Sequence, residues 1–273
     1  MTDETGQAAA LRSFTLARDG RVEILTLDGV AVVRMNRPAK RNALDREQIA
    51  ALSSALDWVA QAPEIRVTVL TGSGNAFCAG GDIEMFQGIN PDTAWDFTRS
   101  GYDLLRPLET GRKPVIAAVH GYCLAGGLEI ALACDFIIAD ATARFGLAEV
   151  NLGLIPGWGG TVRIGRALPI RLARQMVMTC ERLDAARARD MGLVNEVAPA
   201  GGALERAIAL ATLISNQPLL AVQGAKAVLN AVECDTDEML ALEGSIAAGL
   251  FNTTQVTRRV SAWVQGNQSK SRD

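Results

Sequence analysis

Two glutamates are the first residues in this sequence whose type and surroundings suggest chemistry. Glu129 lies in the first turn of an expected helix, Glu149 follows an expected strand, and both have apolar neighbours. A carboxylate in apolar surroundings costs free energy unless it is paired or used, and its pKa rises. Two such groups in a dry pocket could hold one water molecule and divide the roles of acid and base. The spacing along the chain does not show that they meet.

Two glycine pairs could supply backbone N–H donors that stabilise negative charge in such a site. Gly80-Gly81 follows an expected strand and loop, and Gly126-Gly127 directly precedes an expected helix. Glycine lets a ligand approach main-chain N–H groups closely, and amides at a helix N-terminus have no intrahelical acceptor. The amides of Gly81 and Gly126 could therefore converge on one oxygen as it gains negative charge. Tight turns explain the same glycines, so both interpretations stay open.

The elements that must position these residues alternate between strand and helix. Residues 22–27 and 30–35 are β-rich, and the Asp28-Gly29 step between them predicts a hairpin. Asp45 is the expected N-cap of a helix, since apolar residues then recur at helical spacing. Further along the chain the expected elements are strands at 66–71, 115–119, 136–139 and 144–145, and helices at 93–105, with Pro107 helping to end it, and at 128–134. This alternation predicts an α/β fold with a mainly parallel core.

The β signal fades beyond residue 158. The expected helices there cover 158–166, 169–179, 184–191, 203–231 with a break near Pro218, and 235–249. We therefore predict three regions: a mobile tail over residues 1–12, an α/β core over 13–200, and a helical C-terminal region over 201–273.

Composition excludes several classes of function. With 273 residues, a net charge of −3 and about half of its residues apolar, the chain can bury a large core and has no general attraction to nucleic acid or anionic lipid. Its five cysteines form no C-x-x-C pair and it has one histidine, so neither a disulfide framework nor a metal site is expected. The sequence begins without a signal-peptide pattern and has no membrane-length apolar run, which predicts a cytoplasmic location.

Six segments, in this order, resemble the crotonase (enoyl-CoA hydratase/isomerase) superfamily. They are Asn36–Leu44 (NRPAKRNAL), Phe77–Asp82 (FCAGGD), Lys113–Gly121 (KPVIAAVHG), Ala125–Glu129 (AGGLE) with Cys134-Asp135, Phe145–Gly160, and Arg187–Val197. Each segment alone is a weak signal, whereas all six in order, over about residues 20–250, are specific.

The resemblance implies a crotonase-like core of repeated ββα units with a helical C-terminal region that mediates assembly into a trimer or a dimer of trimers. It implies an acyl-CoA thioester as substrate, with CoA as part of that substrate and no separate cofactor. By this resemblance the N–H groups of Gly81 and Gly126 form an oxyanion hole. The substrate-binding residues that it implies are Lys40, Arg41, Ala43, Ala79, Asp82, Ile83 and Trp158. Lys40 and Arg41 can meet CoA phosphates, although an exposed basic turn is the alternative for each.

Hydratases of this superfamily generally carry both glutamates, whereas many isomerases keep only the one matched by Glu149. The leading expectation is therefore reversible hydration of a trans-2-enoyl-CoA to a 3-hydroxyacyl-CoA, in which Glu149 protonates the α-carbon and Glu129 activates the water. A double-bond isomerase, another crotonase reaction, or a non-catalytic acyl-CoA-binding oligomer are the alternatives. The chain departs from typical hydratases at Glu84, where a lysine is usual, and at Trp158, where small residues are frequent.

Overall fold

The computed structural model describes residues 12–15, 20–86 and 91–231. Contacts along the backbone divide the chain into two compact units, residues 1–213 and 214–273. The predicted boundary at residue 200 precedes this division, and the assembly role assigned to the C-terminal region stays a prediction. Residues 1–11 of the tail expected over 1–12 lie outside the described residues, whereas Arg12 begins a strand. The expected helix over 235–249 also lies outside the described residues.

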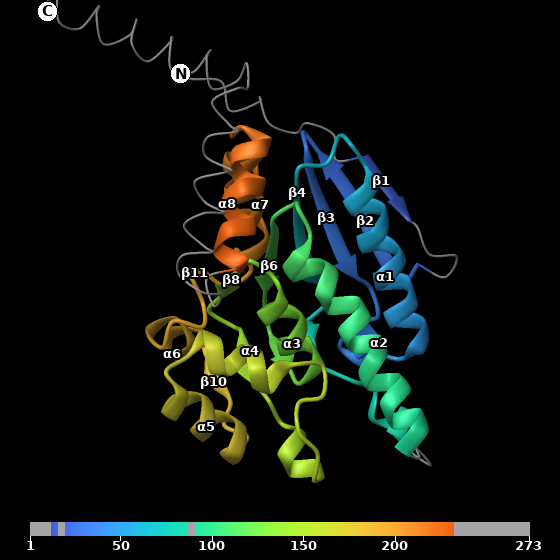
Figure 1. Cartoon of the computed structure of the whole chain (residues 1–273), viewed down its shortest axis with the longest axis vertical. Coiled ribbons are helices and arrows are strands. Elements are labelled where there is room, and N and C mark those ends of the chain that lie inside the picture. Colours follow the sequence, from blue (N-terminus) through green and yellow to red (C-terminus); the bar gives the residue numbers. More distant parts are fainter. Residues whose placement is uncertain (1–11, 16–19, 87–90, 232–273) are drawn as a thin grey trace, which may run out of the picture. The chain divides into compact units, whose positions relative to one another are not determined.

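The first unit contains a seven-stranded sheet with the strand order β1-β2-β3-β4-β6-β8-β11. Strands β1 to β3 are antiparallel, and β3, β4, β6, β8 and β11 run parallel (Figure 1). The bounds are β1 Arg12–Thr15, β2 Val22–Leu27, β3 Val30–Met35, β4 Val67–Gly72, β6 Val115–Val119, β8 Phe136–Asp140 and β11 Glu196–Ala198. The central strands β4 and β6 are buried along their whole length, as expected of a parallel sheet that is covered on both faces.

A smaller, four-stranded sheet has the order β10-β9-β7-β5. Its strands are β5 Ala76–Cys78, β7 Tyr122–Leu124, β9 Arg144–Gly146 and β10 Leu183–Asp184. The chain repeatedly gives one strand to the large sheet, the next to the small sheet, and then forms a helix, as in β4-β5-α2 and β6-β7-α3. The predicted core of repeated ββα units is therefore confirmed.

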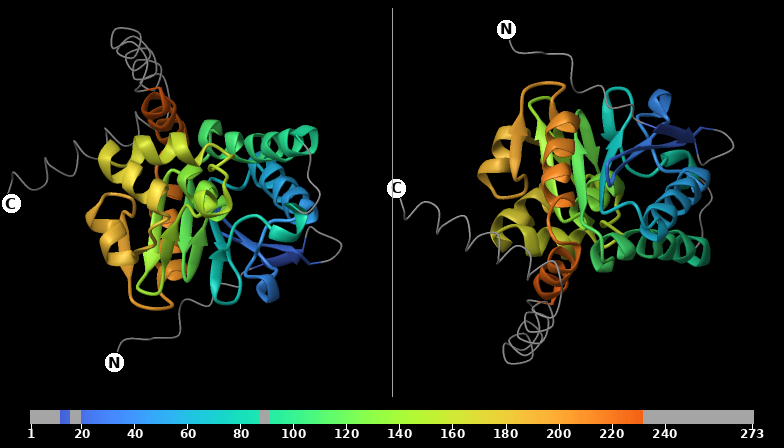
Figure 2. Two further views of the ribbon diagram at one scale, coloured as in Figure 1. Left: turned by 90° about the horizontal axis from the view of Figure 1, so that it is seen from below. Right: turned by 90° about the horizontal axis from the view of Figure 1, so that it is seen from above.

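Helices of the first unit cover its two sheets (Figures 1 and 2). The N-cap of α1 is Asp45, whose side chain accepts a hydrogen bond from Gln48 N, as predicted. The α-helices are α1 Arg46–Gln61, α2 Pro91–Thr110, α3 Gly126–Ala133, α4 Gly160–Ala167, α5 Ile170–Thr179, α6 Ala185–Asp190, α7 Ala203–Ser215 and α8 Leu219–Asn230. Short 3-10 helices are η1 Pro38–Lys40, η2 Ile83–Phe86 and η3 Glu149–Leu152.

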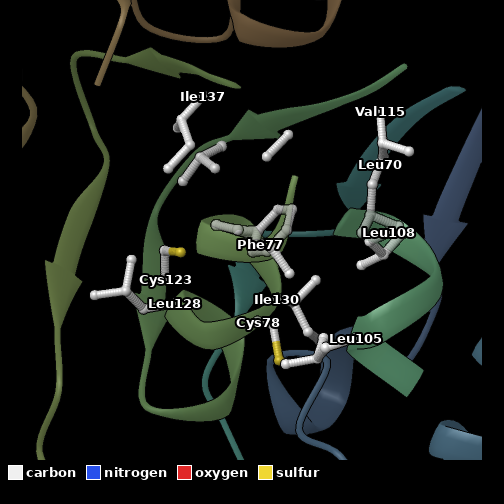
Figure 3. Packing of buried hydrophobic residues seen from close by; sticks show 14 of the residues in the cluster. Leu70, Phe77, Cys78, Leu105, Leu108, Val115, Cys123, Leu128, Ile130 and Ile137 are labelled. Carbon is white, nitrogen blue, oxygen red and sulfur yellow. The ribbon is translucent and has the colours of Figure 1, made fainter. Parts of the chain in front are cut away.

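The core lies between the sheets and the helices α1, α2 and α3. Phe77 of β5, Leu105 of α2 and Ile130 of α3 are fully buried and pack in one cluster (Figure 3). Because α3 belongs to this core, the residues of its first turn have little freedom to move. The core therefore fixes the part of the chain that carries Glu129.

Two predicted helix ends are wrong. Helix α2 continues to Thr110 with Pro107 inside it, rather than ending before this proline. Leu104, Leu105 and Leu108 are all buried, so packing of the last turn offsets the hydrogen bond that proline cannot make. Helix α3 starts at Gly126, two residues before the predicted Leu128, so the glycine pair forms its first turn.

Candidate active site

Glu149 carries a half-buried carboxyl group, one oxygen of which is enclosed without a hydrogen-bond donor among the described residues. It is the first residue of η3, and among the described residues none donates a hydrogen bond to its Oε2. Burial raises the pKa of Glu149 to about 7, and the negative charge of Glu129 also raises it. Structural carboxylates are normally paired when buried, so an unpaired one near neutrality suits proton transfer.

Glu129 is held in a different way, although its side chain is also buried. Its Oε1 accepts hydrogen bonds from Trp158 N at 2.8 Å and from Gly160 N at 2.7 Å. Burial raises the pKa of Glu129, whereas these two N–H groups and the charge of Arg163 lower it. Its ionised form is thus better supported than that of Glu149. The predicted pair comes together, because the charge of one carboxylate acts on the other.

The turn that holds Glu129 is itself held by Arg163 of α4. The Arg163 guanidinium makes two contacts with Glu109 of α2, Nε to Oε1 at 2.5 Å and Nη2 to Oε2 at 2.8 Å. Its Nη1 donates to Trp158 O at 2.5 Å. Arg163 therefore joins α2, α4 and the turn at Trp158, and fixes the two amides that bind Glu129.

Gly126 offers a backbone N–H at the start of α3. Its amide precedes the first intrahelical hydrogen bond, which Glu129 N donates to Ala125 O at 3.0 Å. Ala125 has φ 49° and ψ −126°, an unfavourable conformation for a residue with a Cβ. This strained N-cap turns the chain sharply from β7 into α3.

Gly81 offers the second N–H from an adjoining loop. Leu44 N donates to Gly80 O at 2.8 Å, and Asp82 N donates to Leu44 O at 3.0 Å. Because successive peptide groups in an extended segment point to opposite sides, the Gly81 amide points away from Leu44. Among the described residues, neither Gly81 N nor Gly126 N has an acceptor.

The two glycine loops touch. A Cβ on Gly80 would lie 2.7 Å from Ala125 Cβ and 3.3 Å from Gly126 N. Only glycine permits this approach, and Gly80 also has a φ of +100°. Two donors without acceptors on touching loops are the arrangement expected of an oxyanion hole, and this role of Gly81 and Gly126 stays a prediction.

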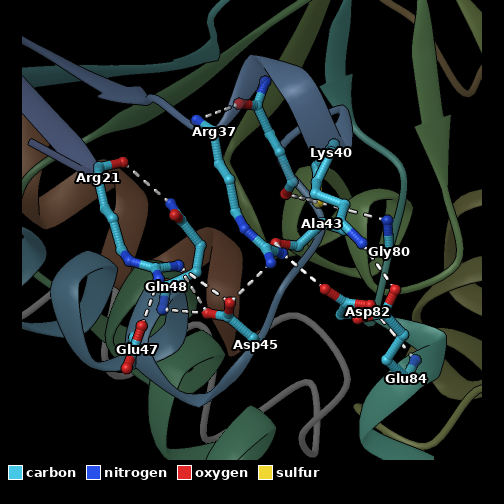
Figure 4. Close-up of polar contacts among 12 residues, drawn as sticks. Arg21, Arg37, Lys40, Ala43, Asp45, Glu47, Gln48, Gly80, Asp82 and Glu84 are labelled. Carbon is cyan, nitrogen blue, oxygen red and sulfur yellow. Dashed lines mark hydrogen bonds and ion pairs between the residues drawn. The ribbon is translucent and has the colours of Figure 1, made fainter.

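A network of polar side chains behind these loops holds the Gly81 loop in place (Figure 4). Arg37 Nη1 donates to Asp82 Oδ2 at 2.8 Å and to Ala43 O at 3.1 Å, and Arg37 Nη2 lies 3.0 Å from Asp45 Oδ2. The Arg37 guanidinium lowers the pKa of Asp82. The carboxylate of Asp82 is buried and faces Arg37, and its predicted place along the substrate path stays a prediction.

Asn42 supports the same loop from within the core. It is fully buried in a left-handed conformation, with φ 57°. Its Nδ2 donates to the carbonyls of Ser73, Ala76 and Phe77 at 2.9, 2.8 and 3.2 Å, and its Oδ1 accepts from Arg37 N at 2.8 Å. Asn42 thus fixes β5 against the segment that pairs with Gly81.

The other predicted substrate-binding residues follow these two segments. Ala79 N donates to Arg41 O at 3.0 Å, and the Arg41 guanidinium carbon lies 4.9 Å from the centre of the Tyr122 ring. Lys40 is exposed, and its Nζ pairs with Glu84 at 2.7 Å; Ile83 is exposed beside it. Both basic side chains therefore already have partners that a phosphate would compete with or displace.

The described residues include no group of three or more His, Cys, Asp and Glu side chains placed to bind a metal ion. Within the same residues, no single helix is long and apolar enough to cross a membrane. The broken pair α7 and α8 meets the length and hydropathy requirements only when its two segments are taken together.

Comparison with known proteins matches residues 26–269 to the family described as enoyl-CoA hydratase/isomerase. The chain belongs to this family. Its sequence is 36% identical over 245 residues to the short-chain-enoyl-CoA hydratase of Clostridium acetobutylicum, which covers 89% of this chain and 94% of that protein. It is 37% identical over 228 residues to the crotonyl-CoA hydratase of Syntrophomonas wolfei, which covers 83% of this chain and 87% of that protein.

A crystal structure of an enoyl-CoA hydratase from Bacillus anthracis superimposes with a TM-score of 0.86 at 31% identity, covering 90% of this chain and 96% of that one. The predicted membership of the enoyl-CoA hydratase/isomerase family and the predicted fold are therefore confirmed. The individual roles of Gly81, Gly126, Glu129 and Glu149 stay predictions that the geometry supports.

Sequence reasoning missed three residues that position the site of this enoyl-CoA hydratase/isomerase family member. Arg37 and Asn42 lie inside the motif Asn36–Leu44, and the buried bonds that they make gave no signal beyond that motif. Nothing in the sequence indicated Arg163. Its partner Glu109 is 54 positions away, and its contact with Trp158 is to a backbone carbonyl.

Proposed function

We propose that this protein catalyses the reversible hydration of trans-2-enoyl-CoA to 3-hydroxyacyl-CoA. The observation on which the proposal rests is the contrast between buried Glu129 and half-buried Glu149. Glu149 has an unpaired Oε2 and a pKa of about 7, whereas Glu129 is anchored by two amides. An acid and a base with different environments, side by side, suit the addition of water across a double bond.

The reaction follows from this arrangement. The thioester oxygen accepts hydrogen bonds from Gly81 N and Gly126 N, which draws electrons from the double bond and leaves C3 electrophilic. Ionised Glu129 takes a proton from the bound water as its oxygen bonds to C3. The electrons of the double bond then form the enolate, and protonated Glu149 gives its proton to C2. Proton exchange resets the two carboxyl groups, and the same steps in reverse give dehydration.

CoA forms part of the substrate, so we propose no separate cofactor. Lys40 and Arg41 are the residues that we propose for the CoA phosphates. The presence of both glutamates favours hydration over double-bond isomerisation, for which one carboxylate suffices to move a proton between carbons.

We also propose that the protein assembles as a homo-oligomer, a trimer or a dimer of trimers. Exposed apolar side chains gather in and after η3, which is unusual for a surface facing water. These side chains are Val150, Leu152, Leu154, Ile155 and Val162. Light scattering on the full chain gives the number of subunits, and a monomer at micromolar concentration contradicts this part of the proposal.

The test of the activity is incubation with crotonyl-CoA, followed by the loss of absorbance of the conjugated thioester and by the mass of the product. Hydration adds one water to the substrate. A shift of a 3-enoyl-CoA into conjugation with no hydration of crotonyl-CoA would indicate an isomerase instead. Binding of acyl-CoA with no turnover of any enoyl-CoA would indicate a scaffold.

A further inference from the structure

The indole of Trp158 fills a notch that Gly101 leaves in helix α2. A Cβ on Gly101 would lie 2.1 Å from Trp158 Cγ and 2.2 Å from Cδ1 and Cδ2, distances that no real side chain tolerates. Trp158 is 3% exposed, so the ring is enclosed as well as seated. Any side chain at position 101 must displace this ring.

Helix α2 also fixes the orientation of the ring. Trp158 Nε1 donates to Phe97 O at 3.2 Å, and the Phe97 and Trp158 rings lie 5.1 Å apart at an angle of 43°. Phe97 and Gly101 are one helical turn apart, so both contact the indole from the same face of α2. The ring is therefore a fixed wall.

The ring also lies next to the start of α3. A Cβ on Gly126 would lie 3.6 Å from Trp158 Cε3 and Cζ3, so the six-membered ring packs against Gly126, the residue whose amide we propose to bind the thioester oxygen. The backbone of the same residue binds Glu129. The indole thus occupies the space between the start of α3 and α2, directly beside the place where an acyl chain must begin.

We infer that Gly101 and Trp158 together determine acyl-chain length, and restrict this protein to short-chain 2-enoyl-CoA substrates such as crotonyl-CoA. The inference rests on the proposed hydration, because it places the acyl chain at that site. A longer chain cannot extend past a buried ring that is held on α2, since interiors are packed without spare volume. Gly101 is the enabling residue, because without its notch the indole could not lie there.

The test compares kcat/KM for crotonyl-CoA, 2-hexenoyl-CoA and 2-decenoyl-CoA. Replacing the indole in Trp158→Ala opens the space, so the ratio of decenoyl to crotonyl kcat/KM rises about tenfold or more, the size of effect that pocket methylenes have. Trp158→Leu, which keeps an apolar side chain, gives a smaller rise in the same direction and serves if the alanine variant does not fold. Trp58→Ala on α1 is the matched control and keeps the wild-type ratio. An unchanged ratio in both Trp158 variants overturns the inference.

A second pair of variants tests the notch itself. Gly101→Ala pushes the indole from its seat and lowers kcat/KM for crotonyl-CoA about tenfold or more, as small displacements near reacting atoms do. In a Trp158→Ala background the same change meets no ring, so it leaves activity unchanged and raises the melting temperature, because alanine favours helix over glycine. Equal effects of Gly101→Ala in both backgrounds contradict the inference.

The chain-length inference can also be tested without turnover, so its failure can be told apart from failure of the proposed hydration. If the wild-type protein hydrates no enoyl-CoA, calorimetric affinities for butyryl-CoA and decanoyl-CoA replace the rates. The wild type then binds butyryl-CoA more tightly, and Trp158→Ala narrows or reverses the preference. Equal affinities in the wild type overturn the chain-length inference independently of turnover.

Discussion

At the scale of single residues, two identical side chains lie in different surroundings. Glu129 Oε1 accepts two backbone hydrogen bonds, while Glu149 Oε2 is buried without a donor. Hydrogen bonds to the charged form lower a carboxyl pKa, and burial without them raises it. The assignment of base to Glu129 and acid to Glu149 rests on this difference.

The pH dependence of the reaction tests this assignment. Hydration needs protonated Glu149, whose pKa is about 7, so kcat/KM for crotonyl-CoA falls as the pH rises above that value. Hydration takes up no net proton, so the equilibrium constant fixes the ratio of kcat/KM in the two directions at every pH. Dehydration of 3-hydroxybutyryl-CoA therefore loses kcat/KM above the same pH, because the pair of glutamates then carries no proton. Initial rates in both directions from pH 5 to 9 provide the measurement. A kcat/KM for hydration that does not fall above about pH 7 would remove the role of Glu149 as the acid.

Glu84 is one of the positions at which the sequence was expected to depart from typical hydratases, and its side chain pairs with Lys40. In Glu84→Gln, Lys40 is released for the CoA phosphates, so KM for crotonyl-CoA falls about threefold at low salt, the size expected of an exposed ion pair. The effect fades at high salt because such pairs are screened. Steady-state kinetics with crotonyl-pantetheine, which lacks the nucleotide phosphates, is the control. An equal change with both substrates would mean that Lys40 does not bind CoA phosphates.

At the scale of elements, the segment 37–45, called the clamp below, holds the loop that carries Gly81 through hydrogen bonds. Asn42 bonds three carbonyls at the edge of this loop, and Arg37 bonds Asp82 within it. These side chains touch no reacting atom in the proposed mechanism. Their effect is to hold the Gly81 amide beside that of Gly126.

Replacing Asn42 tests the clamp. Asn42→Ala leaves buried carbonyls without donors and lowers the free energy of unfolding by about 2–3 kcal/mol. It also lowers kcat more than it raises KM, because a misplaced amide costs most in the transition state. Urea unfolding and steady-state kinetics provide the two measurements. Asn75→Ala, at an exposed position, is the control. If Asn42→Ala changes kcat and KM no more than this control does, Asn42 does not position the loop.

Local pattern predicted many of the elements, and in places their ends. The strands 22–27, 30–35 and 115–119 have the predicted bounds, since apolar runs and turn residues mark them. The end of α2 was wrong because a proline signal competes with tertiary packing, and packing of Leu108 prevails. Sequence pattern therefore works best where local and tertiary preferences agree.

At the scale of the whole molecule, the family resemblance predicted the fold and the candidate site residues. The contacts among these residues became visible only in the tertiary structure. Trp158 N meets Glu129 across 29 positions, Arg37 meets Asp82 across 45, and Arg163 meets Glu109 across 54. No periodicity in the sequence encodes such contacts, because they depend on how separate ββα units pack. The notch at Gly101 was missed for the same reason.

The central claim is that Glu129 and Glu149 act together on one water molecule at an enoyl-CoA. The most direct measurement is the rate of crotonyl-CoA hydration by Glu129→Gln and Glu149→Gln, each checked by circular dichroism for an intact fold. Glutamine keeps the shape and removes the titrating group, so kcat falls about 100-fold or more in each variant, the loss expected for an acid–base group. Wild-type turnover in both variants would contradict the claim.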